Sequence, residues 1–237
     1  MKLDELNIEI FADGADFQSI QKLNEINYIK GFTTNPSLMK KAGISDYKDF
    51  AVSLMSKIKD KPISFEVFSD DLVEMETQAD EISKWGKNVN IKIPVTNTKK
   101  EKATELIRKL SSKGIFCNVT ALFTTQQIDE VFEAVDKSTP AILSIFAGRI
   151  ADTGVDPAKI IKHAVELTKS KPNTKILWAS TREILNIFQA NDLGCHIITV
   201  PHEILNKLSS LNKNLDEYSL ETVKSFYKDA VSAGFKI

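Results

Sequence analysis

The sequence predicts an α/β protein: a single (β/α)8 TIM barrel with an additional C-terminal helix, in which residues 1–237 form one domain. Eight short apolar runs alternate with helical segments along the chain. A strand followed by a helix, repeated eight times, implies parallel strands joined by crossover helices. The length of 237 residues is close to the roughly 250 that such a barrel needs. A doubly wound open sheet is the alternative, but no GxGxxG motif follows a strand, which counts against a dinucleotide-binding fold.

The predicted strands are mostly rich in Ile, Val, Phe or Leu, as expected of strands that are buried on both faces. No low-complexity stretch or Pro/Gly/Ser-rich linker separates them, which favours one domain over two. In chain order the strands are Ile8–Asp13, Gly31–Asn35, Ile63–Phe68, Val89–Val95, Ile115–Leu122, Ala141–Gly148, Lys175–Ser180 and Cys195–Val200.

Helix boundaries are marked by capping residues between these strands. The segments Thr98–Glu101 and Thr124–Gln127 have the spacing of capping boxes, in which a Thr hydroxyl accepts from a first-turn N–H and Glu or Gln reaches back. Gly114 follows an amphipathic stretch as a predicted C-terminal cap. Asp156 precedes a proline at a predicted helix start. The tail, Asp216–Gly234, is predicted to form one further helix.

Composition narrows the function classes. The formal net charge of −1 gives no electrostatic case for binding nucleic acid or an anionic membrane surface. The three histidines, His163, His196 and His202, lack metal-ligand spacing, so no metal site is predicted. Cys117 and Cys195 lie in apolar runs and are interpreted as small buried hydrophobic residues in a reducing compartment.

The N-terminal segment is too acidic and too interrupted for a signal peptide. No apolar run approaches the roughly 20 residues of a membrane-spanning helix. We therefore expect a soluble, cytoplasmic protein that does not associate with membranes.

Polar side chains inside the predicted strands are the best guide to function, because a buried polar group costs a few kcal/mol unless it is paired. Lys92 is the most informative of them. Side chains alternate along a strand, so Lys92 projects into the barrel if Ile91 and Ile93 pack against the helices. A lysine at a strand end more often extends to solvent. A desolvated lysine, however, becomes a nucleophilic amine suited to Schiff-base chemistry.

Two acidic residues lie on other predicted strands. Asp13 closes the first strand, where it could instead cap the following helix, although Asp16 could fill that role equally well. Glu66 lies within the third strand, where a solvated carboxylate is hard to explain. Two carboxylates near one lysine would supply the general acid and base that imine chemistry requires.

Further polar residues are predicted to converge at the carboxyl ends of the strands, where the active sites of such barrels lie. Arginines at strand ends make good phosphate sites, because a guanidinium can bind a phosphate through two hydrogen bonds, although a single surface arginine is more often part of an ion pair. The pairs that share a strand face are Thr33 with Asn35, Asn118 with Thr120, and Ser144 with Phe146, and the candidate phosphate ligands are Arg149, Ser180 and Arg182.

At these residues the sequence resembles the transaldolase family, and its length resembles the short branch that also contains fructose-6-phosphate aldolases. The resemblance covers nearly the whole chain in the family's order. Departures occur around Asp13, at Trp178 and at Asp152, and they leave the acceptor sugar open. The segments that carry the resemblance are Gly31–Leu38, Ser64–Val67, Ile91–Thr96, Asn118–Thr120, Ser144–Arg149 and Ala179–Arg182.

The resemblance implies a mechanism without a metal or other cofactor. Lys92 would form a Schiff base with the C2 carbonyl of a ketose phosphate, and Asp13 would take the C4 hydroxyl proton as the C3–C4 bond breaks. Glu66, with Thr120, would hold a water that shuttles protons. The retained dihydroxyacetone unit would then attack an aldose phosphate. Sedoheptulose 7-phosphate and fructose 6-phosphate are the implied donors, and glyceraldehyde 3-phosphate and erythrose 4-phosphate are the implied acceptors.

The remaining residues are implied to bind these sugar phosphates: Asn35 and Asn118 would hold hydroxyls, Thr33 and Ser144 would line the pocket, and Arg149, Ser180 and Arg182 would bind the phosphate. Family members that transfer the unit have Glu and Phe where aldolase members have Gln and Tyr. Glu66 and Phe146 therefore favour transfer over release of dihydroxyacetone. An aldolase and a catalytically silent sugar-phosphate-binding barrel stay open as alternatives. The resemblance also implies a homo-oligomer, a pentamer or decamer, with the C-terminal helix on a neighbour.

Overall fold

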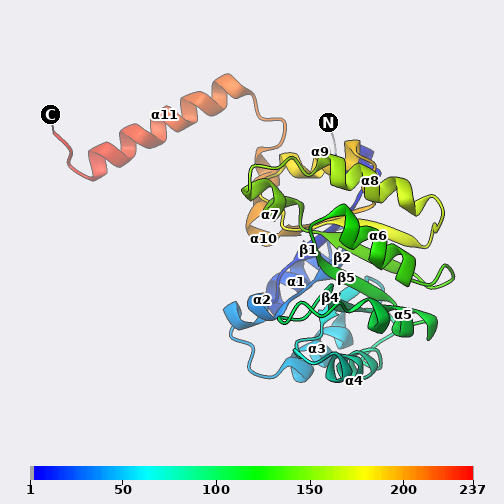
Figure 1. Ribbon diagram of the computed structural model, residues 1–237. Coiled ribbons are helices and arrows are strands. Elements are labelled where there is room, and N and C mark those ends of the chain that lie inside the picture. The colour runs from blue at the N-terminus through cyan, green and yellow to red at the C-terminus, as the bar shows by residue number, and fades with distance from the viewer. Residues whose placement is uncertain (1–2, 237) are drawn as a thin grey trace.

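The computed structural model of the protein describes residues 3–236. Eight parallel strands follow one another in chain order around a closed barrel, and β8 pairs with β1 to close it (Figure 1). The predicted (β/α)8 barrel is thereby confirmed. The strands are β1 (Glu9–Asp13), β2 (Ile29–Thr33), β3 (Ile63–Glu66), β4 (Val89–Pro94), β5 (Cys117–Leu122), β6 (Ala141–Ile145), β7 (Thr174–Trp178) and β8 (Ile197–Pro201).

Helices follow the strands and cover the outside of the barrel (Figure 1). A short 3-10 helix, η1 (Leu3–Glu5), precedes β1, and a second one, η2 (Asn206–Ser210), directly follows the helix that ends at Leu205. The α-helices are α1 (Phe17–Asn24), α2 (Pro36–Lys41), α3 (Tyr47–Lys57), α4 (Leu72–Ile82), α5 (Thr104–Ser112), α6 (Thr125–Ala134), α7 (Ala147–Asp152), α8 (Ala158–Thr168), α9 (Leu185–Asp192), α10 (His202–Leu205) and α11 (Leu215–Ser232).

Every predicted strand overlaps an observed one, but five of them end one to three residues earlier than predicted, and the second and the sixth show why. The second ends at Thr33, because the Asn35 side chain accepts a hydrogen bond from the Leu38 N–H (3.0 Å) and caps α2. The sixth ends at Ile145, and the chain turns into α7 at Ala147. In both cases a polar or aromatic residue assigned to a strand lies instead in the turn that follows it.

The predicted helix caps were confirmed except for one. Thr124 and Gln127 form the expected capping box at the start of α6, and Gly114 has a positive φ of 79° after α5. Asp156 accepts from the Ala158 N–H (2.9 Å) at the start of α8. The capping box at Thr98 was wrong: both its amide and its hydroxyl bind the Asp70 carboxylate, and α5 begins only at Thr104.

The apolar core has two layers. The larger layer lies between the barrel and the helices and includes Ile91 and Ile93, which are 1% and 0% exposed. Lys92 lies between them on the strand, so the alternation of side chains turns it into the barrel. The smaller layer fills the barrel interior with Phe11, Ile142, Leu177, Ala179 and Ile197. Burial of one such large side chain stabilises the fold by about 1.5–3 kcal/mol.

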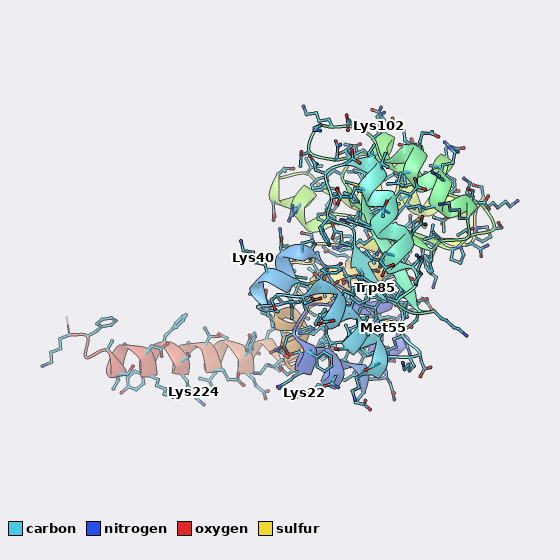
Figure 2. All side chains as sticks on the ribbon, turned by 90° about the horizontal axis from the view of Figure 1, so that it is seen from below. Lys22, Lys40, Met55, Trp85, Lys102 and Lys224 are labelled. Carbon is cyan, nitrogen blue, oxygen red and sulfur yellow. The ribbon has the colours of Figure 1, made fainter. Side chains whose placement is uncertain are left out.

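Helix α11 confirms the predicted additional C-terminal helix, and it extends away from the barrel (Figures 1 and 2). Its N-cap, Asn214, accepts from the N–H groups of Asp216 and Glu217. None of its residues is buried, and it exposes large apolar side chains such as Val223, Phe226 and Tyr227. The two cysteines are buried and free, as expected from their apolar runs. Within residues 3–236 no helix has the length and apolar character needed to cross a membrane.

Candidate active site

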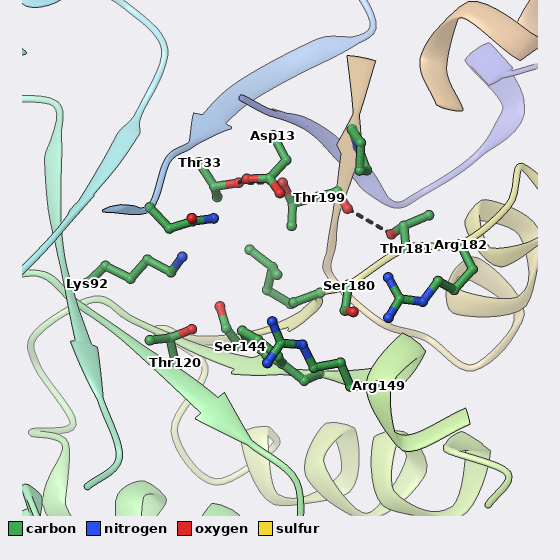
Figure 3. Close-up of a pocket in the computed structure, with 15 residues that line it drawn as sticks. Asp13, Thr33, Lys92, Thr120, Ser144, Arg149, Ser180, Thr181, Arg182 and Thr199 are labelled. Carbon is green, nitrogen blue, oxygen red and sulfur yellow. Dashed lines mark hydrogen bonds between the residues drawn. The ribbon is translucent and has the colours of Figure 1, made fainter. Parts of the chain in front are cut away.

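A cavity of about 220 Å³ opens at the carboxyl ends of the barrel strands (Figure 3). All of the predicted site residues line it except Glu66 and Asn118. Residues from seven different strands or the turns that follow them meet here, as is typical of such barrels. The lining residues are Asp13, Thr33, Asn35, Lys92, Thr120, Ser144, Phe146, Arg149, Leu177, Ala179, Ser180, Thr181, Arg182, Thr199 and Pro201.

Lys92 points into this cavity and is only 7% exposed. Its ammonium Nζ lies 3.1 Å from Glu66 Oε2 and donates to the Thr34 carbonyl at 3.1 Å. Glu66 and Lys92 are register partners across the β3–β4 pair, so their side chains lie on the same face. Glu66 therefore belongs to the site through Lys92, although it does not line the cavity. A buried charge is tolerated only when it is paired in this way.

Asp13 lies opposite Lys92, at the end of β1. Its Oδ1 accepts from the Thr33 hydroxyl at 2.7 Å, and that hydroxyl lies 2.5 Å from the Thr199 hydroxyl (Figure 3). Burial raises the pKa of the Asp13 carboxyl above its usual value, and the Lys92 charge and the Thr33 hydrogen bond partly offset this. The helix-capping alternative is excluded, because Asp16 caps α1 by accepting from the Ser19 N–H (2.7 Å).

Asn118 is 0% exposed and does not line the cavity. Its side-chain amide donates to the Ser64 hydroxyl (2.9 Å), and its carbonyl accepts from the Ser144 hydroxyl (2.6 Å). Ser144 in turn lines the cavity. Thr120 also lines it, and the buried Thr120 hydroxyl has no hydrogen-bond partner among the residues that the structure describes. A buried hydroxyl left without a partner is costly, which is typical of a group that binds water or substrate.

Two arginines stand on the side of the cavity formed after β6 and β7 (Figure 3). Arg149 lies in α7 rather than at a strand end, and its guanidinium lies 5.2 Å from the centre of the Phe146 ring. Arg182 follows β7 and donates to Asp152 from Nε (3.2 Å) and from Nη2. This pairing lowers the pKa of the Asp152 carboxyl.

Close backbone contact brings these two arginines together. Ser180 has a φ of +64°, in the left-handed region. A Cβ at position 148 would lie 1.6 Å from the Ser180 carbonyl oxygen, so only glycine allows α7 to approach the loop after β7 this closely. Gly148 therefore sets the spacing between Arg149 and the Ser180–Arg182 segment.

Sequence reasoning missed several lining residues: Leu177, Ala179, Thr181, Thr199 and Pro201. Thr199 could have been found, because it is a polar residue inside the apolar run of the eighth predicted strand. Its hydroxyl contacts Thr33, and its carbonyl accepts from the Thr181 hydroxyl at 2.7 Å. The sequence also gave no signal that Asp152 pairs with Arg182.

Comparisons with known proteins point to one family. A family model described as "Transaldolase/Fructose-6-phosphate aldolase" matches residues 10–237. A "Probable transaldolase" of Dehalococcoides mccartyi is 35% identical over 202 residues, which cover 85% of this chain and 90% of that protein. A "Probable transaldolase" of Thermoanaerobacter sp. is 34% identical over 233 residues, which cover 97% of this chain and 100% of that protein.

A solved structure of 2,3-dimethylmalate lyase, a member of the PEP mutase/isocitrate lyase superfamily, resembles the chain in fold. Its TM-score is 0.57 at 11% sequence identity, and the match covers 98% of this chain and 86% of that one. At this identity the likeness concerns the barrel alone.

Proposed function

The chain belongs to the transaldolase/fructose-6-phosphate aldolase family, and from this premise we propose that it is a transaldolase that acts through a Schiff base on Lys92. It would transfer a dihydroxyacetone unit from sedoheptulose 7-phosphate or fructose 6-phosphate to glyceraldehyde 3-phosphate or erythrose 4-phosphate. One observation carries the proposal: Lys92 is buried at the cavity, paired with Glu66 on one side and facing Asp13 on the other.

Imine formation needs a neutral amine and a route for protons. Glu66, 3.1 Å from Nζ, can accept the ammonium proton, so that the amine attacks the C2 carbonyl of the donor. The carbinolamine then loses water to give the iminium. We assign the proton shuttling of this step and of the final hydrolysis to a water held by Glu66 and the unpartnered Thr120 hydroxyl.

Carbon–carbon cleavage follows from the iminium. Asp13 takes the proton of the C4 hydroxyl, the C3–C4 bond breaks, and its electron pair moves toward the iminium to give the enamine while the aldose leaves. Addition reverses these steps: the enamine attacks the acceptor aldehyde, and Asp13 returns the proton to the new hydroxyl. The raised pKa of the Asp13 carboxyl suits a group that must both accept and return a proton.

Substrate binding is assigned to the rest of the cavity. Arg149, Ser180 and Arg182 would bind the phosphate, because charge-assisted hydrogen bonds from guanidinium groups favour a phosphate dianion. Asn35, Thr33 and Ser144 would contact the dihydroxyacetone unit. Asn118 was expected to hold a substrate hydroxyl directly. It would instead act on the substrate through Ser144, whose hydroxyl donates a hydrogen bond to the Asn118 side chain.

Transfer is favoured over aldol release by Glu66 and Phe146, the residue types of family members that transfer the unit. Phe146 lines the cavity with an apolar ring, 5.7 Å from the ring of Phe123. An apolar wall offers no proton donor to the enamine, so the enamine would persist until an acceptor arrives.

Borohydride reduction in the presence of fructose 6-phosphate, followed by peptide mass spectrometry, tests the proposal. We expect one adduct, on Lys92, together with transfer to glyceraldehyde 3-phosphate in a coupled assay. Rapid dihydroxyacetone release without an acceptor, faster than transfer, would assign an aldolase instead. No adduct and no turnover with any sugar phosphate would leave only a binding role.

We further propose that residues 1–237 form one catalytic domain, that the enzyme acts in the cytoplasm in the pentose phosphate pathway, and that it is a pentamer or decamer. The apolar side chains that α11 exposes, among them Val223 and Phe226, support an oligomer in which this helix contacts a neighbouring copy. Light scattering of the full chain and of a chain truncated after residue 213 would test this: a parent that runs as a monomer contradicts it.

A further inference from the structure

Tyr47, on the outside of the barrel, makes two hydrogen bonds to the backbone of Glu66. Its hydroxyl accepts from the Glu66 N–H at 2.8 Å and donates to the Glu66 carbonyl at 2.8 Å. Tyr47 is the first residue of α3, and Glu66 is the last residue of β3. One side-chain hydroxyl therefore satisfies both backbone groups of the residue that pairs with Lys92.

The neighbouring strand cannot provide these two bonds. The β2–β3 ladder runs through Phe32 N–H to Pro62 carbonyl and Thr34 N–H to Ser64 carbonyl. One more rung would need the N–H of residue 36 and the carbonyl of Thr34. Residue 36 is proline and has no N–H, and the Thr34 carbonyl instead accepts from Lys92 Nζ.

The Tyr47 hydroxyl thus occupies the place of a missing rung, at the point where β2 turns away into α2. The Thr34 carbonyl is therefore free to accept a hydrogen bond from Lys92, while the Tyr47 hydroxyl holds the backbone of Glu66. Burial raises the pKa of Tyr47 above its usual value, so the hydroxyl keeps the proton that it donates.

Aromatic packing fixes the hydroxyl in turn. The Tyr47 ring lies 5.4 Å from the ring of Phe68, 5.8 Å from that of Trp85 and 6.3 Å from that of Phe65, measured between ring centres. Figure 2 labels Trp85, which lies beside the helices that cover this side of the barrel. Because the ring is held on several sides, removing the hydroxyl alone should leave the packing in place.

We propose that Tyr47 is a positioning residue, which acts through Glu66 to fix the carboxylate relative to Lys92 for imine formation and hydrolysis. The inference rests on the role of Glu66 in the proposed function. A misplacement of about 1 Å can cost about 100-fold in rate, so loss of the two hydrogen bonds should lower the rate of the imine steps while leaving the phosphate contacts intact.

The test is Tyr47→Phe, which keeps the ring and removes the hydroxyl. We expect kcat and the rate of borohydride-trapped adduct formation to fall by about 10- to 100-fold, with KM for fructose 6-phosphate within about threefold of the parent. Thr139→Val is the matched control, because it also removes a buried hydroxyl bonded to a backbone carbonyl, that of Ser111 (2.8 Å), remote from the cavity. Parental kcat in Tyr47→Phe, or an equal loss in Thr139→Val, would overturn the proposal.

A double-mutant cycle with Glu66→Ala, which removes the side chain that Tyr47 would position, separates positioning from general damage to the fold. If Tyr47 acts through Glu66, then adding Tyr47→Phe to Glu66→Ala should change the trapping rate by less than about twofold. If Tyr47→Phe lowers the trapping rate by the same factor in the parent and in the Glu66 variant, the assignment is overturned. A parent that gives no adduct would refute the proposed function and this inference together, whereas a parent that gives one leaves the cycle to judge Tyr47 alone.

Hydrogen exchange gives a readout that does not depend on catalysis, and a neighbouring amide on the same strand controls for any change in the variant's stability. In the parent the Glu66 amide should be protected, because its N–H donates to the Tyr47 hydroxyl in place of a neighbouring strand. In Tyr47→Phe that amide should exchange faster, while Phe65 keeps its protection from the paired β4. A Glu66 amide that exchanges in the parent as fast as an exposed loop amide would show that the Tyr47 hydroxyl does not hold the Glu66 backbone.

Discussion

The guanidinium of Arg182 donates to both carboxylate oxygens of Asp152. A residue that we propose to bind the substrate phosphate is therefore already paired in the substrate-free protein. Both side chains are about half exposed, and such a pair contributes little to stability. Its effect is instead geometric, because the carboxylate orients the planar guanidinium toward the cavity that both arginines line. A bound phosphate would then meet Arg182 in a fixed orientation beside Arg149.

Arg182→Ala should raise KM for phosphorylated donors by about 10- to 100-fold, because a charge-assisted bidentate contact that only the phosphate can use is lost. The KM for unphosphorylated analogues should change far less. Steady-state kinetics with both substrate classes check this, with Arg108→Ala on the exposed face of α5 as the control. An equal effect on both classes would move the phosphate site to Arg149 alone.

Lys92→Ala should abolish the covalent adduct and nearly all turnover, since Lys92 is the one lysine among the described residues that lines the cavity. Lys92→Arg should do the same, because a guanidinium stays protonated and is not a nucleophile. Borohydride trapping with mass spectrometry provides the measurement. If either variant still forms an adduct, another lysine is the nucleophile.

The acid limb of the pH profile should report Asp13, which must be ionised to take the hydroxyl proton. Burial raises the pKa of this carboxyl, so kcat/KM should begin to fall at a pH above the ordinary carboxyl range of about 4. Thr33→Val removes a hydrogen bond that lowers this pKa, and should move the limb to higher pH. Thr199→Val removes a hydroxyl that contacts the Thr33 hydroxyl, and it should move the limb less, because the Thr33 hydrogen bond to Asp13 stays in place. An unmoved limb in Thr33→Val would assign it to another group.

Asp13 should also lower the stability of the protein at neutral pH. Its folded-state pKa lies above the unfolded value, so the stability gained by protonation is complete below the unfolded pKa of about 3.9 and is lost as pH rises through the folded pKa. The Tm of Asp13→Asn relative to the parent should therefore rise between acidic and neutral pH.

Asp152→Asn is the control of opposite sign for this experiment. Arg182 lowers the pKa of the Asp152 carboxyl, so its stabilising contribution is present above the unfolded pKa and is lost as pH falls. The relative Tm of Asp152→Asn should fall from acidic to neutral pH. Thermal melts across this range that show the same trend for both variants would contradict the assignment for Asp13.

Phe146→Tyr tests the choice between transfer and aldol release. The new hydroxyl would lie at the cavity wall, where it can orient water and assist protonation of the enamine. We expect more dihydroxyacetone release from fructose 6-phosphate without an acceptor, and less transfer. The ring is already partly exposed to the cavity, so Tm should change little. A variant that folds normally and partitions like the parent would make Phe146 a packing residue, and the preference for transfer would then rest on Glu66.

The sequence determined the barrel and most of the polar residues that line its cavity through local periodicity. Apolar runs broken by helical segments predicted all eight strands, and the alternation of side chains along β4 predicted that Lys92 faces inward between Ile91 and Ile93. These signals are local, because the direction of a side chain on a strand depends only on its neighbours in the chain. The same logic applied to β8 would have found Thr199.

Only the tertiary structure decided which polar groups meet. Thr98 has the spacing of a capping box, yet it binds Asp70, which is 28 residues away in sequence. Arg182 pairs with Asp152 only because Gly148 lets α7 approach the loop after β7. Tyr47 reaches Glu66 because Pro36 ends the β2–β3 ladder. Each contact depends on strand register and on the closure of the barrel, which bring together residues whose separation in sequence carries no periodic signal.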